Sequence, residues 1–289
     1  IMRDDPNPTN AGNVDFMVNF SEPVINVDSA DFALTTVGLS GVSISAINGS
    51  GDTYVVSVDT GNGKGTLRLD VQDNDSITDA ASNPLGGNGT DDGSFYNGES
   101  YSVGSPTFSD VPASYWAWGW IESLFSSGIT GGCGSGLYCP ENTVTRAQMA
   151  IFLLRGIHGS SYTPPAAAGN IFGDVPATHW AANWIEQLYA ESITGGCGAG
   201  SYCPEQSVTR AQMAIFLLRA KHGASYMPPA VGVSTGFGDI SSSYWAAAWI
   251  KQLAAEGITT GCGNGNYCPE QPVSRAQMAI FLVRTFNLP

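Results

Sequence analysis

The sequence predicts a chain of two parts, an antiparallel β-sandwich followed by an all-helical body built from three repeats. The segment Ile129–Arg155 recurs almost unchanged as Ile193–Arg219 and again as Ile258–Arg284. Such self-similarity at a fixed period is typical of repeat architectures. Charge divides the chain as well, because residues 1–105 hold 15 of the 25 acidic residues and only 3 of the 11 basic ones. The two parts therefore meet near Gly104.

The first part alternates apolar and polar residues in several short stretches that Gly- and Asn-rich turns separate. Alternation with a period of two is typical of strands with one buried face. About seven such strands without any helical period predict an antiparallel β-sandwich. The clearest stretches are Val14–Phe20, Val42–Ile47, Tyr54–Val58 and Thr66–Val71.

An acidic run near the end of the first part admits two interpretations. Carboxylates at short spacing can wrap a calcium ion, which prefers several oxygen ligands. Asp and Asn are also common in solvated turns that bind no ion. The run lacks the glycine and the final glutamate of an EF-hand loop. The candidate calcium ligands are Asp70, Asp73, Asp75 and Asp79.

Each repeat opens with an aromatic residue and, two positions later, an aspartate: Asp110, Asp174 and Asp239. A short amphipathic helix should follow, since Trp180, Trp184 and Leu188 fall on one helical face. The second tryptophan of each helix is expected in the core. The first suits either the core or stacking on a ligand, and these residues are Trp116, Trp180 and Trp245.

Six cysteines form three pairs of identical spacing, and each pair closes a Gly-rich loop. An even number with local pairing predicts three disulfides and an oxidising compartment. Zinc is the alternative, but each pair would need two further ligands and neither His nor a third Cys lies nearby. The expected pairs are Cys133 with Cys139, Cys197 with Cys203 and Cys262 with Cys268.

A Ser/Thr-Arg-Ala-Gln motif follows each cysteine loop and predicts a capping box at a helix start. Capping leaves the arginine unexplained, because a cation at the first helical position opposes the helix dipole. Its guanidinium suits an anion held at the helix N-terminus, or an internal salt bridge to the aspartate that opens a repeat. The arginines are Arg146, Arg210 and Arg275.

The helix after each motif is apolar all round, as in Met149–Leu154. Such a helix needs burial on most sides. Three copies around one axis would satisfy it, which predicts a pseudo-threefold body with a central three-helix bundle. The expected domains are 1–104 for the β-sandwich and 105–158, 159–222 and 223–289 for the repeats.

The β part resembles bacterial Ig-like repeats of large secreted surface proteins, through the segments NFSEPV, DFALTT and GTLRLDVQDNDSITDAASNPLGG. This resemblance covers residues 1–103. It implies an Ig-like sandwich that serves as a stalk or spacer, and further copies ahead of Ile1. The sequence begins without Met, so we expect a trimmed product or part of a longer chain.

The repeats resemble the S-layer homology domain over residues 107–286, because each copy carries F-x-D, W-A, I-T-x-G, Y-C-P-E and T/S-R-A-Q in order. The resemblance implies a pseudo-trimer around a three-helix bundle that anchors proteins to the cell surface by binding cell-wall polysaccharide, often pyruvylated. The motif arginines would hold the acidic sugar, with the three first tryptophans and the three aspartates near the groove.

Two features depart from that family. Its motif more usually ends in Glu, where this chain has Gln148, Gln212 and Gln277, and its members do not generally carry the cysteine pairs. The Gln keeps the helix cap and removes a charge. The cysteines favour an envelope in which disulfides form readily, so the identity of the glycan stays open.

An alternative function is self-assembly into an S-layer, sheath or filament. An exposed edge strand can accept a strand from another copy, and residues 1–11 would be the donor. The partners expected are therefore envelope polysaccharide and copies of the chain itself, at an extracellular, cell-surface location.

Other function classes find little support. The acidic charge and the absence of basic clusters argue against nucleic acid. No apolar run reaches the 18 residues of a membrane span. An enzyme is not expected, because the three histidines, His158, His179 and His222, lack any nucleophile or metal motif.

Overall fold

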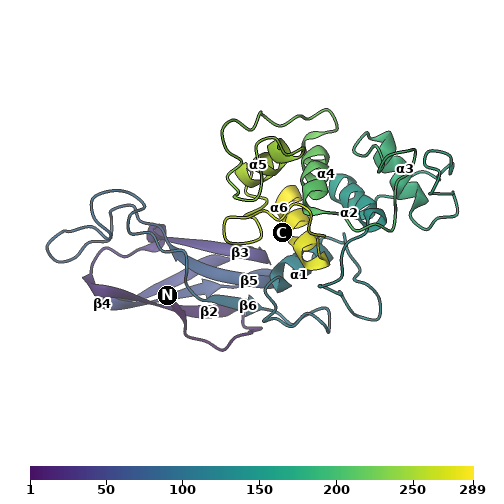
Figure 1. Ribbon diagram of the computed structural model, residues 1–289. Coiled ribbons are helices and arrows are strands. Elements are labelled where there is room, and N and C mark those ends of the chain that lie inside the picture. Colours follow the sequence, from purple (N-terminus) through teal and green to yellow (C-terminus); the bar gives the residue numbers. More distant parts are fainter. The chain divides into compact units, whose positions relative to one another are not determined.

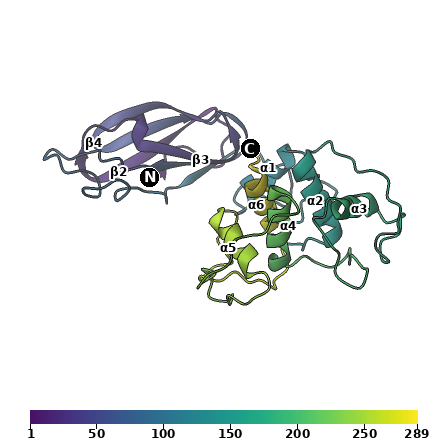
Figure 2. The same cartoon turned by 90° about the horizontal axis from the view of Figure 1, so that it is seen from above.

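Strands occupy the first part of the chain and helices the rest, as Figures 1 and 2 show. The chain has six α-helices. The computed structural model describes residues 1–289. The chain divides into two units, Ile1–Ser126 with Pro289, and Ser127–Leu288. This division falls inside the first predicted repeat, so the first helix of that repeat belongs to the β unit.

The β unit contains two three-stranded antiparallel sheets (Figure 1). One sheet has the order β1-β2-β4, and the other has the order β3-β5-β6. A short 3-10 turn, Ser29–Asp31, precedes β3. The strands are β1 (Met2–Arg3), β2 (Asn13–Val24), β3 (Phe32–Ser40), β4 (Ser43–Asp59), β5 (Asn62–Val71) and β6 (Ser100–Val103).

Strand β4 contains two of the predicted stretches, because it folds back on itself at Gly49. The hydroxyl of Ser45 donates to the carbonyl of Ser57, so the two halves lie side by side. Gly49 has a φ of +141°, and a Cβ there would lie 2.4 Å from the carbonyl oxygen of Thr53. Only glycine fits this turn without displacing backbone.

A single hydrophobic core joins the two sheets of the β unit. It buries alternate residues of β2, β4 and β5, including Phe16, Val56 and Leu67. Tyr101 of β6 packs edge-to-face on Phe16 with ring centroids 5.0 Å apart. Its hydroxyl donates to the carbonyl of Asp15, which satisfies the polar end of a fully buried ring.

The N-terminal segment, which the sequence suggests as a strand donor, pairs with strands of its own chain. Met2 lies opposite Met17 in β1 and β2. The backbone N–H of Thr9 donates to the carbonyl of Ser102 in β6. The segment therefore contacts the edges of both sheets.

Helix α1 (Trp118–Ser126) packs against β3 and β5. The close approach requires a small residue, since a Cβ on Gly119 would already touch Thr66. Glu122 is buried on this helix, and its carboxylate accepts hydrogen bonds from the backbone and hydroxyl of Thr107 and from the indole of Trp118. Three donors compensate for burying the charge.

The second unit contains five helices, of which α2, α4 and α6 contact one another. Helix α3 packs on α2, and α5 packs on α4. The mutual contacts of the three apolar helices bury residues such as Met149, Leu217 and Met278. The bounds are α2 (Arg146–His158), α3 (Ala182–Ala190), α4 (Arg210–His222), α5 (Ala247–Ala255) and α6 (Arg275–Phe286).

Backbone hydrogen bonds close the three repeats into a cycle just before these helices. Val144 donates to Val273, Val273 donates to Val208, and Val208 donates to Val144, each at 2.9 Å. All three valine side chains are fully buried. Each repeat therefore supplies a backbone partner that another repeat needs.

Candidate binding grooves

Groove 1 is a cavity of about 320 Å³ in the helical unit. The loop Ile129–Cys133 forms one wall, and the face of α2 forms another. Trp180 comes from the second repeat and Arg275 from the third, so all three repeats contribute. The α2 residues are Gln148, Ile151, Phe152 and Arg155.

Groove 2 is the equivalent cavity one repeat later and measures about 300 Å³. Its loop is Ile193–Cys197, its helix is α4, and its tryptophan is Trp245. The α4 residues that line it are Gln212, Ile215, Phe216 and Arg219. Two grooves of similar composition thus arise from the repetition in the sequence, and only groove 1 has a motif arginine among its lining residues.

The three tryptophans that the sequence assigns to a core or to a ligand site are largely exposed. Trp180 and Trp245 keep 58% and 59% of their surface accessible, and each lines a groove. Trp116 is 59% exposed and lies in the β unit. Trp249, by contrast, is buried on α5. Exposed rings beside a cavity are available for contact with a ligand.

The motif arginines are buried, with 2% to 4% of their surface exposed. The Nε of Arg146 donates to the carbonyl of Tyr202 at 2.7 Å, and the hydroxyl of Tyr202 donates back to the carbonyl of Arg146. The guanidinium also lies over the Tyr202 ring, 4.7 Å from its centroid. Arg210 with Tyr267 and Arg275 with Tyr138 repeat this arrangement.

Each guanidinium sits between two aromatic rings. Arg146 has Tyr202 on one side and Phe216, a residue of groove 2, on the other at 5.6 Å. The Nη2 atoms of Arg146 and Arg210 are buried without a hydrogen-bond partner. Burial lowers the pKa of both guanidiniums, although an arginine stays charged at neutral pH. An unpaired donor of this kind favours an incoming acceptor.

Asp174 caps the end of the second cysteine loop. Its carboxylate accepts the backbone N–H groups of Tyr202 and Cys203 at 2.8 and 2.7 Å, and Asp239 does the same for Tyr267 and Cys268. Burial opposes the charged form of Asp174, but the backbone donors outweigh it and lower its pKa. Asp110 begins the equivalent segment in the β unit.

The start of each apolar helix is already satisfied. The capping boxes are confirmed, since Thr145, Thr209 and Ser274 each pair with the glutamine three residues on. The N–H groups of Arg146 and Ala147 donate to Gln206 and Pro204 of the next repeat. These donors at the helix start are therefore occupied within the fold.

The disulfide prediction is confirmed in all three loops: Cys133–Cys139, Cys197–Cys203 and Cys262–Cys268. The paired Cα atoms lie 6.0 Å apart in each loop, an ordinary separation for a disulfide. No cysteine is left free.

Sequence reasoning missed an arginine in each groove. Arg155 lines groove 1 and donates to the carbonyl of Ile129, and Arg219 does the same in groove 2 with Ile193. Their guanidiniums lie 5.5 Å from the ring centroids of Trp184 and Trp249. The signal was present, since each arginine follows its motif arginine by the same interval.

The structure separates the four predicted calcium ligands. Asp73 and Asp75 come together with Asp92, their ligand atoms within 4.8 Å of one another. The pKa of Asp92 is raised, first by desolvation and then by the neighbouring carboxylates of Asp73 and Asp75. Asp70 instead pairs with Arg68 at 2.6 Å, and Asp79 binds the side chain of Asn83.

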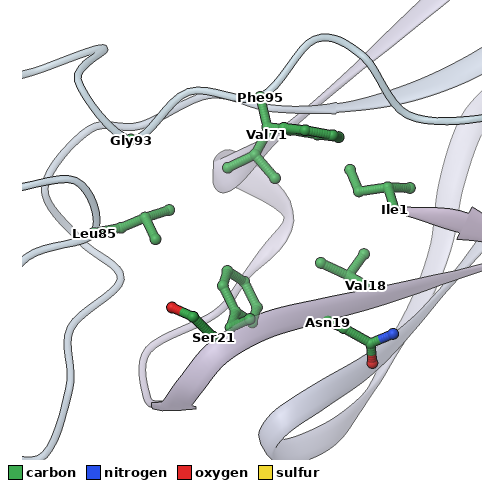
Figure 3. Close-up of a pocket in the computed structure, with 9 residues that line it drawn as sticks. Ile1, Val18, Asn19, Ser21, Val71, Leu85, Gly93 and Phe95 are labelled. Carbon is green, nitrogen blue, oxygen red and sulfur yellow. The ribbon is translucent and has the colours of Figure 1, made fainter.

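A third cavity, of about 320 Å³, lies in the β unit (Figure 3). Val18, Val71, Leu85 and Phe95 give it an apolar lining, and Ile1 lies at its side (Figure 3). It contains neither an arginine nor a carboxylate among its lining residues. It differs in chemistry from the two grooves of the helical unit.

Comparison with known proteins identifies the repeats. Residues 107–150, 171–214 and 236–279 match the S-layer homology domain, so the chain contains three tandem copies of it. The chain is 27% identical over 173 residues to a cellulosome-anchoring protein of Acetivibrio thermocellus, a match covering 57% of this chain. It is also 32% identical over 126 residues to the S-layer protein EA1 of Bacillus anthracis, over 44% of this chain.

Similarity also extends to an enzyme, an amylopullulanase of Thermoanaerobacterium thermosulfurigenes, with 32% identity over 61% of this chain. The chain spans 38%, 14% and 9% of the lengths of these three relatives. The repeats mark the chain as a cell-surface protein. None of its helices has the length and apolar character that crossing a bilayer requires.

Proposed function

We propose that this chain anchors a protein to the cell surface by binding an anionic envelope polysaccharide in the grooves of its helical unit. The observation that carries the proposal is the composition of the grooves. Each is lined by an arginine and an exposed tryptophan, and neither has a carboxylate among its lining residues. The name of the cellulosome-anchoring relative agrees with this role.

The two side-chain types would divide recognition between them. A guanidinium held between aromatic rings, away from water, attracts a carboxylate more strongly than one in solution. The indole of Trp180 or Trp245 offers a broad apolar face to a sugar ring. The loop Gly131–Gly132 in groove 1 carries no side chain that would block close approach. An acidic sugar, such as a pyruvylated hexosamine, fits this combination.

Substitution of the exposed tryptophans tests the proposal with little risk to the fold. Trp180→Ala and Trp245→Ala should each weaken sedimentation with a pyruvylated cell-wall polysaccharide, by roughly tenfold if the ring is a binding hot spot. Met227→Ala is the matched control, because Met227 is 72% exposed and lines neither groove. Undiminished binding by the double tryptophan variant would refute the proposal.

We propose further that the β unit is an Ig-like spacer that projects from the surface. Its 17 acidic residues against 3 basic ones disfavour attachment to an anionic glycan. Lys64 is exposed in this unit. On isolated cell walls, Lys64 should still react with an amine reagent while oxidative footprinting of Trp180 and Trp245 declines. Protection of Lys64 as well would contradict a projecting spacer.

A further inference from the structure

We infer that the disulfide loop of each repeat positions the motif arginine of another repeat, and that in groove 1, where this arginine lines the cavity, the coupling makes anchoring sensitive to thiol reductants. The inference deepens the proposed function and rests on it for its effect on binding. Its structural part, the coupling between a disulfide and a distant arginine, stands independently.

The loop Cys133–Cys139 serves groove 1 at both of its ends. Cys133 belongs to the groove wall. At the other end, the carbonyl of Tyr138 accepts the Nε of Arg275 at 2.7 Å, and Arg275 lines the same groove. One short covalent bridge therefore fixes the distance between the wall and the guanidinium.

Backbone contacts reinforce this connection immediately after the disulfide. The N–H of Ala276 donates to the carbonyl of Pro140, and the N–H of Arg275 donates to Asn142. These two donors are the first of α6, which has no preceding turn of helix to satisfy them. The loop of the first repeat thus caps the helix that carries the arginine of the third.

The other two loops do the same around the cycle. The loop ending at Cys203 holds Arg146 through Tyr202 and caps α2 through Pro204 and Gln206. The loop ending at Cys268 holds Arg210 and caps α4 through Pro269 and Gln271. Each disulfide therefore acts on a helix outside its own repeat.

These loops need the crosslink because their backbones have little preference for the observed shape. Gly132, Gly134 and Gly136 have positive φ, as do Ser135 and Cys139. Glycines lose more conformational entropy on ordering than other residues, and left-handed conformations strain a residue with a side chain. Without the disulfide, the loop would retain its local backbone hydrogen bonds, such as that from the N–H of Cys133 to the carbonyl of Leu137, and the bond from the Tyr138 hydroxyl to the carbonyl of Arg275.

A small thiol can open the bridge by ordinary exchange. Its thiolate attacks one sulfur to form a mixed disulfide and releases the other cysteine as a thiol. A second thiol then attacks the reductant's sulfur in the mixed disulfide and releases the second cysteine, which leaves two protein thiols and one oxidised reductant. Cys133, Cys197 and Cys262 are exposed, so a reductant can reach each loop.

Two paired variants of the full chain test the coupling without any ligand. In the variant Cys133→Ser/Cys139→Ser, hydrogen exchange of the backbone amides is measured by NMR. It should be roughly tenfold faster at Arg275 and Ala276, with a smaller increase at Arg146 and Ala147. Cys197→Ser/Cys203→Ser should give the reverse pattern. An equal increase at both places, or an increase confined to the altered loop, would overturn the inference.

Binding gives the second arm of the experiment. The oxidised chain and the chain reduced with dithiothreitol are titrated with a pyruvylated cell-wall polysaccharide. Roughly tenfold weaker binding after reduction, restored by re-oxidation, is the expected result. Equal binding by both forms would refute the redox sensitivity. If the oxidised chain does not bind at all, the proposed function fails, whereas the exchange pattern still decides the coupling.

Discussion

At the scale of single residues, the motif arginines would combine a structural role with the proposed binding role. Arg146 bonds to Tyr202 through its Nε and its own carbonyl, which ties two repeats together. The same guanidinium keeps Nη2 without a partner beside a residue of groove 2. A cation that is fixed in place by the fold loses little freedom when it binds an anion.

Removing the tyrosine hydroxyl should test the structural half of this arrangement. Tyr202→Phe deletes the donor to the Arg146 carbonyl but keeps the ring, so the free energy of unfolding in urea should fall by about 1 kcal/mol. Tyr189→Phe is the control, because Tyr189 is 44% exposed. An unfolding free energy equal to that of the unmodified chain would contradict the assigned hydrogen bond.

Asp174 should confer acid sensitivity. The pKa of Asp174 is lower in the folded chain than its unfolded value of about 4. The ionised carboxylate therefore stabilises the fold above the unfolded pKa. This stabilisation is lost as the pH falls through the folded-state pKa. Asp174→Asn should therefore differ most from the unmodified chain near neutral pH, and the two should converge in acid. Urea midpoints measured between pH 2.5 and 7 would show this. A difference that does not vary with pH would exclude the carboxylate charge as its source.

At the scale of elements, one position on the first helix of each repeat fastens the segment ahead of it. Glu122 on α1 accepts from Thr107, and Glu186 on α3 accepts the N–H groups of Ala168 and Gly169. On α5 the position is Lys251, which donates to the carbonyls of Val231 and Ser234 instead. In the third repeat the side chain is therefore a donor instead of an acceptor, and its backbone partners are carbonyl groups instead of N–H groups.

Reversing the charge of Lys251 should loosen the linker before α5, which contains Val231 and Ser234. Lys251→Glu would face two carbonyl oxygens and lose both hydrogen bonds, at a cost of about 1 kcal/mol for an exposed site. Chymotrypsin should then cleave faster after Tyr226, within that linker. Lys251→Arg keeps the donors and serves as the control. Cleavage as slow as in the unmodified chain would show that Lys251 does not hold the linker.

Elements whose cause is local could be predicted from sequence. Capping boxes depend on residues three positions apart and the disulfides on residues six apart, and both were found as expected. Contacts between distant segments could not be predicted. No pattern in the sequence shows that the carbonyl of Tyr138 would hold Arg275, or that Asp92 would join Asp73 while Asp70 pairs with Arg68.

At the scale of the whole molecule, the helical unit depends on its three repeats acting together. The cycle of Val144, Val208 and Val273 needs all of them. The arginine–tyrosine pairs also link every repeat to another. Arg146 binds Tyr202, Arg210 binds Tyr267, and Arg275 binds Tyr138. Each of these tyrosines directly precedes the second cysteine of a disulfide loop. Groove 1 takes residues from three repeats, so a single repeat could not form it.

Calorimetric titration of the full oxidised chain gives the most direct test of the central claim. The ligands are a pyruvylated cell-wall polysaccharide and the same polysaccharide after mild acid has removed its pyruvate ketals. If buried guanidiniums recognise the acid group, removing it should weaken binding by at least tenfold, or about 1.4 kcal/mol. Equal affinity for the two polysaccharides would contradict recognition of an anionic glycan in these grooves.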